Sequence, residues 1–84
     1  MAKIVIAKQL AGKKVITNDG EELGKLIDIT VSESNGKMDH LLVEPNLDNA
    51  TARDMHKDDG LLIIPYDAVL AATDHIIVDK KNLR

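Results

Sequence analysis

The amino-acid sequence predicts an all-β domain of about five to six short, mostly antiparallel strands. Two observations carry this prediction: the β-prone apolar runs are short, and turn signals rich in glycine, asparagine or proline separate them. A third is the alternation of apolar and polar residues over Leu26–Ser32, which has the two-residue period of a half-buried strand. This pattern favours a small barrel or sandwich over a helical bundle.

The first part of the chain predicts strands joined by tight turns. The β-prone runs Ile4–Ala7 and Lys14–Thr17 come first. The turn Asn18–Glu21 follows, because its Asp-Gly pair supplies the positive φ that a hairpin turn needs. Gly24 then stands at a position that is typical of a bulge or a sharp bend.

A second hairpin is expected in the middle of the chain. The strand Leu26–Ser32 leads through the turn Ser34–Gly36 into a partner strand, Lys37–Glu44. The residues expected on the buried faces are Ile27, Ile29, Val31, Leu41 and Val43. Pro45 ends the second strand, because proline has no N–H to donate to a ladder.

The segment Asn46–Gly60 is the least strand-like part of the chain. Loops of this length in small domains are either functional or mobile. We expect a mobile excursion in which Ala50–His56 form a short helical turn, capped by Asp48 or Asn49. Residues 32–60 carry seven acids against three bases, so a docking site for a basic partner surface is the functional alternative.

Three carboxylates lie near His56 in this segment: Asp54, Asp58 and Asp59. An imidazole with carboxylates can hold a divalent cation, but the string does not have the spacing of a calcium-binding loop. The sequence therefore predicts neither a metal nor a cofactor, with an ion held by these four side chains as the alternative.

The rest of the chain predicts three short strands. Leu61–Ile64 has no polar face, so we expect it to be covered on both sides. One helical turn near residues 66–69 follows Pro65, and Leu70–Thr73 and Ile76–Asp79 return as strands. We expect a single domain over residues 1–80 and a tail over residues 81–84.

Composition argues against several classes of function. The chain has no cysteine, which excludes disulfides and thiolate sites. The chain has 14 acids against 11 bases, no basic stripe, and Tyr66 as its one aromatic residue. These features argue against nucleic-acid binding. No nucleophile motif or phosphate loop is present, so no enzyme is expected. The apolar runs are too short to span a bilayer, and a cytoplasmic protein without membrane insertion is expected.

The order of these parts resembles the PRC-barrel family. The resemblance lies in LAGKKVITNDGEELGKLIDITV (10–31), HLLVEP (40–45) and GLLIIPYDAVLAATDHIIVD (60–79). The motif residues are Asp19, Gly20, Gly24, Asp28, Ile64, Pro65, Tyr66 and Val69. We expect them to shape turns, bends and a barrel end rather than to perform chemistry. The resemblance implies a small β-barrel.

The resemblance also implies a non-enzymatic role in binding other proteins. Small stand-alone PRC-barrel proteins of archaea are implicated in cell division, which implies an adaptor that binds SepF, the membrane anchor of the FtsZ ring, or a related PRC-barrel chain. Such an adaptor would be recruited to the division site. The alternative is a ribosome- or RNA-maturation role, because the C-terminal domain of the maturation factor RimM belongs to the same family.

Surplus apolar surface predicts a homodimer or a heterodimer. The runs Leu61–Ile64 and Ile76–Val78 are continuously apolar, whereas a barrel strand buries only alternate residues inside. A second subunit would cover the others. The candidate interface residues are Leu62, Ile64, Ile76 and Val78.

Overall fold

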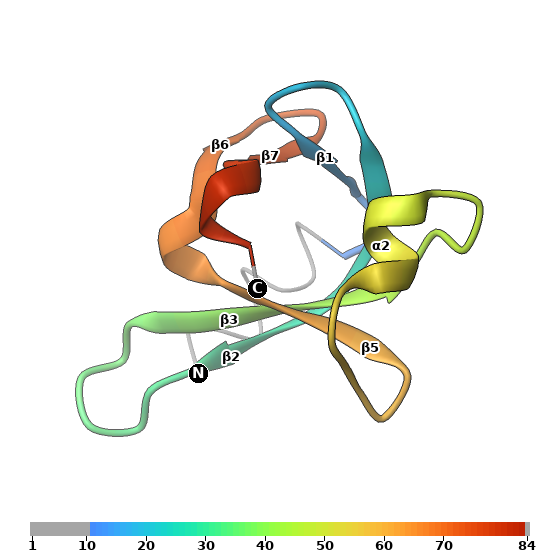
Figure 1. Ribbon diagram of the computed structural model, residues 1–84. Coiled ribbons are helices and arrows are strands. Elements are labelled where there is room, and N and C mark those ends of the chain that lie inside the picture. Colours follow the sequence, from blue (N-terminus) through green and yellow to red (C-terminus); the bar gives the residue numbers. More distant parts are fainter. Residues whose placement is uncertain (1–10, 84) are drawn as a thin grey trace.

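Seven strands form one sheet in the computed structural model of the protein, which describes residues 11–83 (Figure 1). They are β1 (Lys14–Thr17), β2 (Glu22–Val31), β3 (Met38–Pro45), β4 (Lys57–Asp58), β5 (Leu61–Pro65), β6 (Val69–Ala72) and β7 (Ile76–Val78). Their order across the sheet is β4-β5-β3-β2-β1-β7-β6. The predicted all-β class is confirmed, with more strands than expected because the two-residue β4 adds one. The predicted strand Ile4–Ala7 lies outside the described residues.

The strands pair in an antiparallel manner throughout, except that β1 and β7 run parallel. Within residues 11–83 the sheet curls around its core without closing, and β4 and β6 are its two edges. In Figure 1, β2, β3 and β5 cross below the core, and β1, β7 and β6 lie above it. The short helix η1 (Tyr66–Ala68) leads from β5 to β6, which confirms the helical turn predicted near residues 66–69.

The core is aliphatic and lies between the two halves of the curled sheet. Its members are at most 2 % exposed: Val15, Leu23, Leu26, Ile29, Leu41, Val43, Ala52, Leu62, Ile64, Ala68, Ile76 and Val78. Burial alternates along β5 and β7, as the two-residue period of a strand requires. Each fully buried large side chain contributes about 1.5–3 kcal/mol of transfer free energy, so a domain this small depends on nearly every one of them.

A bulge in β2 changes which residues of this strand are buried. Leu26 pairs with Val43 but Asp28 pairs with Leu42, so Ile27 is the extra, unpaired residue of the bulge. The prediction that Ile27 shares the buried face with Ile29 is therefore wrong. Leu26 and Ile29 are buried instead, whereas Ile27 is 47 % exposed. Val31, the third residue of that predicted face, is only half-buried.

The carboxylate of Asp28 supports this bulge. Its Oδ1 accepts a hydrogen bond of 2.7 Å from the backbone N–H of Ile29. The bulge interrupts the regular ladder of the sheet, and a side-chain acceptor beside it satisfies a backbone donor locally. Asp28 therefore has a structural role, which is to stabilise the bulged backbone of β2.

The segment 46–60 is anchored to the domain, contrary to the predicted mobile excursion. Its helix α2 (Ala50–Asp54) begins at Asn49, whose side chain accepts a hydrogen bond of 2.8 Å from the N–H of Ala52. This confirms the predicted cap. Ala52 is fully buried and Met55 packs against the core, so apolar burial holds the helix down.

The C-terminal end of the described chain also packs against the domain. The short helix η2 (Lys80–Asn82) begins at Asp79, whose side chain accepts from the N–H of Lys81 at 3.2 Å. Leu83 packs against the core. Most of the predicted tail over residues 81–84 is therefore part of the fold. Within residues 11–83, no helix has the length and apolar character needed to cross a membrane.

Candidate interaction surface

The four candidate interface residues are buried in the core that the curled sheet encloses. Leu62, Ile64, Ile76 and Val78 are each at most 1 % exposed. The prediction that alternate residues of β5 and β7 face outward is right, but the wrong half of them was assigned to the interface. The outward residues of these strands are the half-buried Leu61, Ile63 and Ile77.

Four large apolar side chains are exposed elsewhere on the described surface. They are Tyr66 at 38 %, Ile27 at 47 %, Leu70 at 57 % and Leu47 at 62 %. Single exposed apolar residues are common on soluble proteins, so their surroundings decide whether they matter. Leu70 stands on an edge strand, and Leu47 stands beside a groove. The sequence contains no signal that separates these two leucines from the buried ones.

The two edges of the sheet differ in chemistry. β4 consists only of Lys57 and Asp58, a short and charged edge of the kind that discourages strand pairing. β6 carries no charge, and three of its residues, Leu70, Ala71 and Ala72, are exposed. Within the described chain β6 pairs with β7 only. An uncharged edge of this kind can accept a further strand, although a register shift beside Leu70 shortens its regular part.

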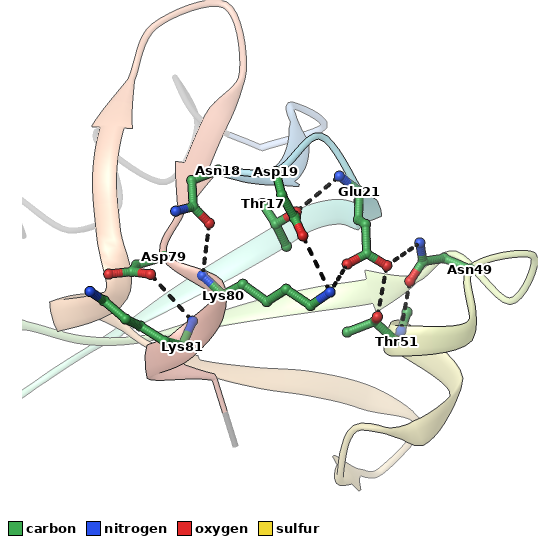
Figure 2. A network of polar contacts seen from close by, with 10 residues as sticks. Thr17, Asn18, Asp19, Glu21, Asn49, Thr51, Asp79, Lys80 and Lys81 are labelled. Carbon is green, nitrogen blue, oxygen red and sulfur yellow. Dashed lines mark hydrogen bonds and ion pairs between the residues drawn. The ribbon is translucent and has the colours of Figure 1, made fainter.

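A network of polar contacts joins the turn before β2, the helix α2 and the helix η2 (Figure 2). Lys80 lies at its centre: its Nζ is 3.3 Å from the Asp19 carboxylate and also pairs with the Glu21 carboxylate. Glu21 accepts hydrogen bonds from the Thr51 hydroxyl at 2.7 Å and from the Asn49 amide at 3.3 Å. The turn before β2, the helix α2 and the helix η2 are thereby tied together.

Thr17 shapes the tight turn that supplies Asp19 and Glu21 to this network. Its Oγ1 accepts a hydrogen bond of 2.9 Å from the N–H of Glu21, and its hydroxyl donates to the Asp19 carboxylate. Gly20 supplies the positive φ of +92° that the predicted tight turn requires. The N–H of Lys80 donates to the Asn18 side chain at 3.1 Å, which fixes η2 against the turn.

These contacts shift the pKa values of the charged groups. The hydrogen bond from Thr17, followed by that from Lys80, holds the pKa of Asp19 below its ordinary value. The hydrogen bonds from Lys80 and Thr51 lower the pKa of Glu21, and those to Glu21 and Asp19 raise the pKa of Lys80. All three groups are thus favoured in their charged forms. Because these charges satisfy one another, the network holds the fold together.

The motif residues identified in the sequence lie at separate places in the fold. Asp19 and Gly20 form the turn before β2, Gly24 lies where β2 approaches β3, and Asp28 supports the bulge. Ile64 is in the core, Pro65 ends β5, Tyr66 begins η1, and Val69 packs against the core.

The residues considered for a metal do not form a site. Among the residues that the structure describes, no group of three or more histidine, cysteine, aspartate or glutamate side chains is placed to hold a metal ion. Asp54 ends α2 and His56 follows two residues later, whereas Asp58 belongs to β4 and Asp59 to the exposed turn between β4 and β5.

Comparison with known proteins assigns this architecture to a family. A model described as the PRC-barrel domain matches residues 4–83. The chain belongs to the PRC-barrel family. PRC-barrel domains are generally non-catalytic interaction modules.

Two known proteins are similar to this PRC-barrel chain. An uncharacterized protein of Methanocaldococcus jannaschii is 34 % identical over 77 residues, which cover 92 % of this chain and 83 % of that protein. A crystal structure described as a 16S ribosomal RNA processing protein, RimM, from Pseudomonas aeruginosa has a TM-score of 0.59 and 26 % identity. That likeness covers 86 % of this chain and 41 % of the RimM chain, so the chain spans about two-fifths of that structure.

Proposed function

We propose that this PRC-barrel chain is a non-enzymatic module that binds other proteins through the outer edge of β6, which has no partner strand within residues 11–83. The observation that carries the proposal is the contrast between the two sheet edges. β4 is protected by charge and shortness, whereas β6 is uncharged and presents Leu70 with 57 % of its surface exposed. A partner strand added there would pair with the outer backbone groups of β6 and cover Leu70.

A second PRC-barrel chain is one such partner. Two copies that pair antiparallel through β6 form a twofold interface, in which the same surface of each copy is used. The edge suits self-pairing electrostatically, because residues 61–84 carry three acids and three bases, whereas the surplus of negative charge lies in residues 32–60. A homodimer, or a heterodimer with a related chain, therefore forms without bringing the acidic regions together.

Ribosome maturation is the process that the structural likeness favours. RimM, the 16S ribosomal RNA processing protein, shares the fold at 26 % identity. With acids in excess over bases, the chain would take part by docking onto a protein component rather than onto RNA. The adaptor role in division, with SepF or a sister PRC-barrel chain as partner, is the other outcome of the test below.

The test is an affinity pull-down from lysate of the source cell, with bound proteins identified by mass spectrometry. Ribosomal proteins in the bound fraction support the maturation role, and SepF or FtsZ supports the division role. The Leu70→Lys variant places a charge on the β6 edge, and we expect it to lose the bound proteins. Ile27→Lys is the matched control, since it charges another exposed apolar residue, which lies on β2 and not on this edge. Equal loss in both variants, or in neither, overturns the proposal.

Light scattering of the purified chain tests self-pairing separately. We expect a dimer for the wild-type chain and for Ile27→Lys, and a monomer for Leu70→Lys. A mixture of Leu70→Lys and Leu70→Glu should restore the dimer, because opposite charges then meet across the twofold axis. A wild-type monomer at hundreds of micromolar rules out self-pairing through β6.

A further inference from the structure

A groove on the outer side of the sheet lies where β3 passes into the loop before α2. It has a volume of about 360 Å³. Its lining residues are Glu22, Gly24, Lys25, Glu44, Pro45, Asn46, Leu47 and Asp48. In the sheet order, β7, β1 and β2 separate β3 from β6, so this groove is distinct from the β6 edge.

Two features of the sequence build the groove. Gly24 leaves its part of the floor without a side chain, since a Cβ there would collide with the backbone of Glu44. Asn46 fixes the rim: its N–H donates to the Leu23 carbonyl at 2.7 Å, and its side-chain amide donates to the Glu22 carbonyl at 3.1 Å. Leu47, on the next position of this anchored loop, is held out at 62 % exposure.

The charges around the groove are unbalanced. Glu22 is paired, because Lys14 Nζ lies 3.6 Å from its carboxylate. Glu44 and Asp48 have no ion-pair partner within 4.0 Å among the residues that the structure describes. An exposed leucine and a proline therefore stand beside Glu44 and Asp48 in one hollow. The lining also holds Lys25, the cross-strand neighbour of Glu44, so three carboxylates there face one lysine.

We propose that this groove receives an arginine side chain of a protein partner. The three methylenes of arginine would lie against Leu47 and Pro45, and its guanidinium would donate to Glu44 and Asp48. Arginine fits better than lysine because its planar fork can donate to two carboxylates at once and is more weakly hydrated. A phosphate-bearing partner would be repelled by the same carboxylates. The proposal deepens the proposed function, because it names the chemistry that a protein partner presents to the module.

The proposal explains why a leucine is fixed in so exposed a place. The backbone and side-chain hydrogen bonds of Asn46 hold the loop before any partner arrives, so binding orders few groups that were mobile. The arginine would cover the apolar surface of Leu47 and add positive charge to a groove whose lining has three carboxylates and, in Lys25, one base.

The experiment titrates the full chain with a blocked peptide that carries one arginine between two leucines, observed by amide NMR shifts. We expect shifts to concentrate on Gly24, Lys25, Leu47 and Asp48. A peptide with citrulline in place of arginine keeps the shape without the charge, and it should bind at least about threefold more weakly. The double variant Glu44→Gln/Asp48→Asn should weaken the arginine peptide by about three- to tenfold at low salt.

The matched control is Asp58→Asn/Asp59→Asn, which removes the same charge from the end of β4 and the turn after it and leaves the groove intact. We expect it to bind the arginine peptide like the wild type. Equal weakening by both double variants, shifts spread over the acidic surface, or equal affinity for the citrulline peptide would each overturn the inference. None of these outcomes depends on β6, so a failed pull-down with a positive titration separates the two proposals.

Discussion

Gly24 on β2 lies so close to the backbone of Glu44 on β3 that no side chain fits between them. A Cβ atom on Gly24 would stand 2.9 Å from the carbonyl carbon of Glu44, 3.0 Å from Val43 Cγ1, and nearer still to the Glu44 carbonyl oxygen. The oxygen cannot withdraw without disturbing the ladder in which Glu44 pairs with Lys25. Two features therefore require this glycine: the close packing of the two strands and its φ of +157°, which residues with a side chain rarely adopt.

We expect Gly24→Ala to lower the free energy of unfolding by about 3 kcal/mol, because overpacking against backbone cannot relax by a change of rotamer. Denaturation in urea measures the loss. Gly36→Ala is the control: Gly36 has a φ of +70°, but a Cβ there meets nothing within 4 Å. It should cost only the left-handed penalty of about 1 kcal/mol. Equal losses in the two variants would show that the contact with Glu44 is not what requires glycine.

The alternation of β5 predicts opposite outcomes for two adjacent isoleucines. Ile64 is fully buried, so Ile64→Ala should cost about 2–5 kcal/mol through lost burial and a residual cavity. Ile63 is half-buried and faces outward, so Ile63→Ala should cost about 1 kcal/mol or less. Urea midpoints of the two variants at equal protein concentration decide the question. A larger loss at Ile63 would mean that an unseen partner covers the outer face.

Local signals in the sequence were sufficient for most of the strands and turns. The Asp-Gly turn, the hairpin after Val31, the end of β3 at Pro45 and the cap at Asn49 are each specified within a few residues. The buried face of β2 was not, because one bulge at Ile27 exchanges the faces of the strand. The bulge adds one residue to the strand. An alternating pattern that assigns the correct face to residues on one side of Ile27 therefore assigns the wrong face to residues on the other side.

The sequence could not predict which strand residues face outward or which distant residues contact one another. Which half of β5 and β7 faces outward depends on how the sheet curls, and both halves are apolar, so Leu62 and Leu61 read alike. Lys80 meets Asp19 and Glu21 from about sixty positions away, and no local pattern announces such a pair. The same contacts explain why the segment 46–60 is anchored, since Glu21 binds Asn49 and Thr51.

The cap of α2 gives a test of that anchoring. We expect Asn49→Ala to cost about 1 kcal/mol, because the N–H of Ala52 loses its acceptor and Glu21 loses a donor. Amide hydrogen exchange at Ala52 and Arg53 should accelerate more than exchange in β3. Asp48→Ala changes the neighbouring residue without removing the cap, and it should leave both readouts near wild type. Unchanged exchange at Ala52 in Asn49→Ala would show that the buried contacts of α2 suffice without the cap.

The ion pairs around Lys80 predict a dependence of stability on pH at the acidic end. The folded-state pKa values of Asp19 and Glu21 are lowered, so their contribution is fully present above the unfolded-state pKa values and is lost as pH falls through the folded ones. The contribution of these two carboxylates to stability therefore begins to fall below about pH 4.5. The raised pKa of Lys80 acts at the other end: its contribution is present below its unfolded-state pKa and is lost as pH rises through the folded one.

The Glu21→Gln variant isolates this effect from the other carboxylates. Its deficit in unfolding free energy relative to wild type should be present at pH 7 and should shrink towards pH 3, because the wild type then loses the charge that glutamine never had. Glu33→Gln, in the exposed turn of the β2–β3 hairpin, should show no such convergence. Absence of a deficit in Glu21→Gln at pH 7 would mean that Glu21 acts through the hydrogen bonds that it accepts from Thr51 and Asn49, which the amide oxygen of glutamine can still accept. A deficit that stays constant from pH 7 to pH 3 would likewise show that the charge of Glu21 is not its source.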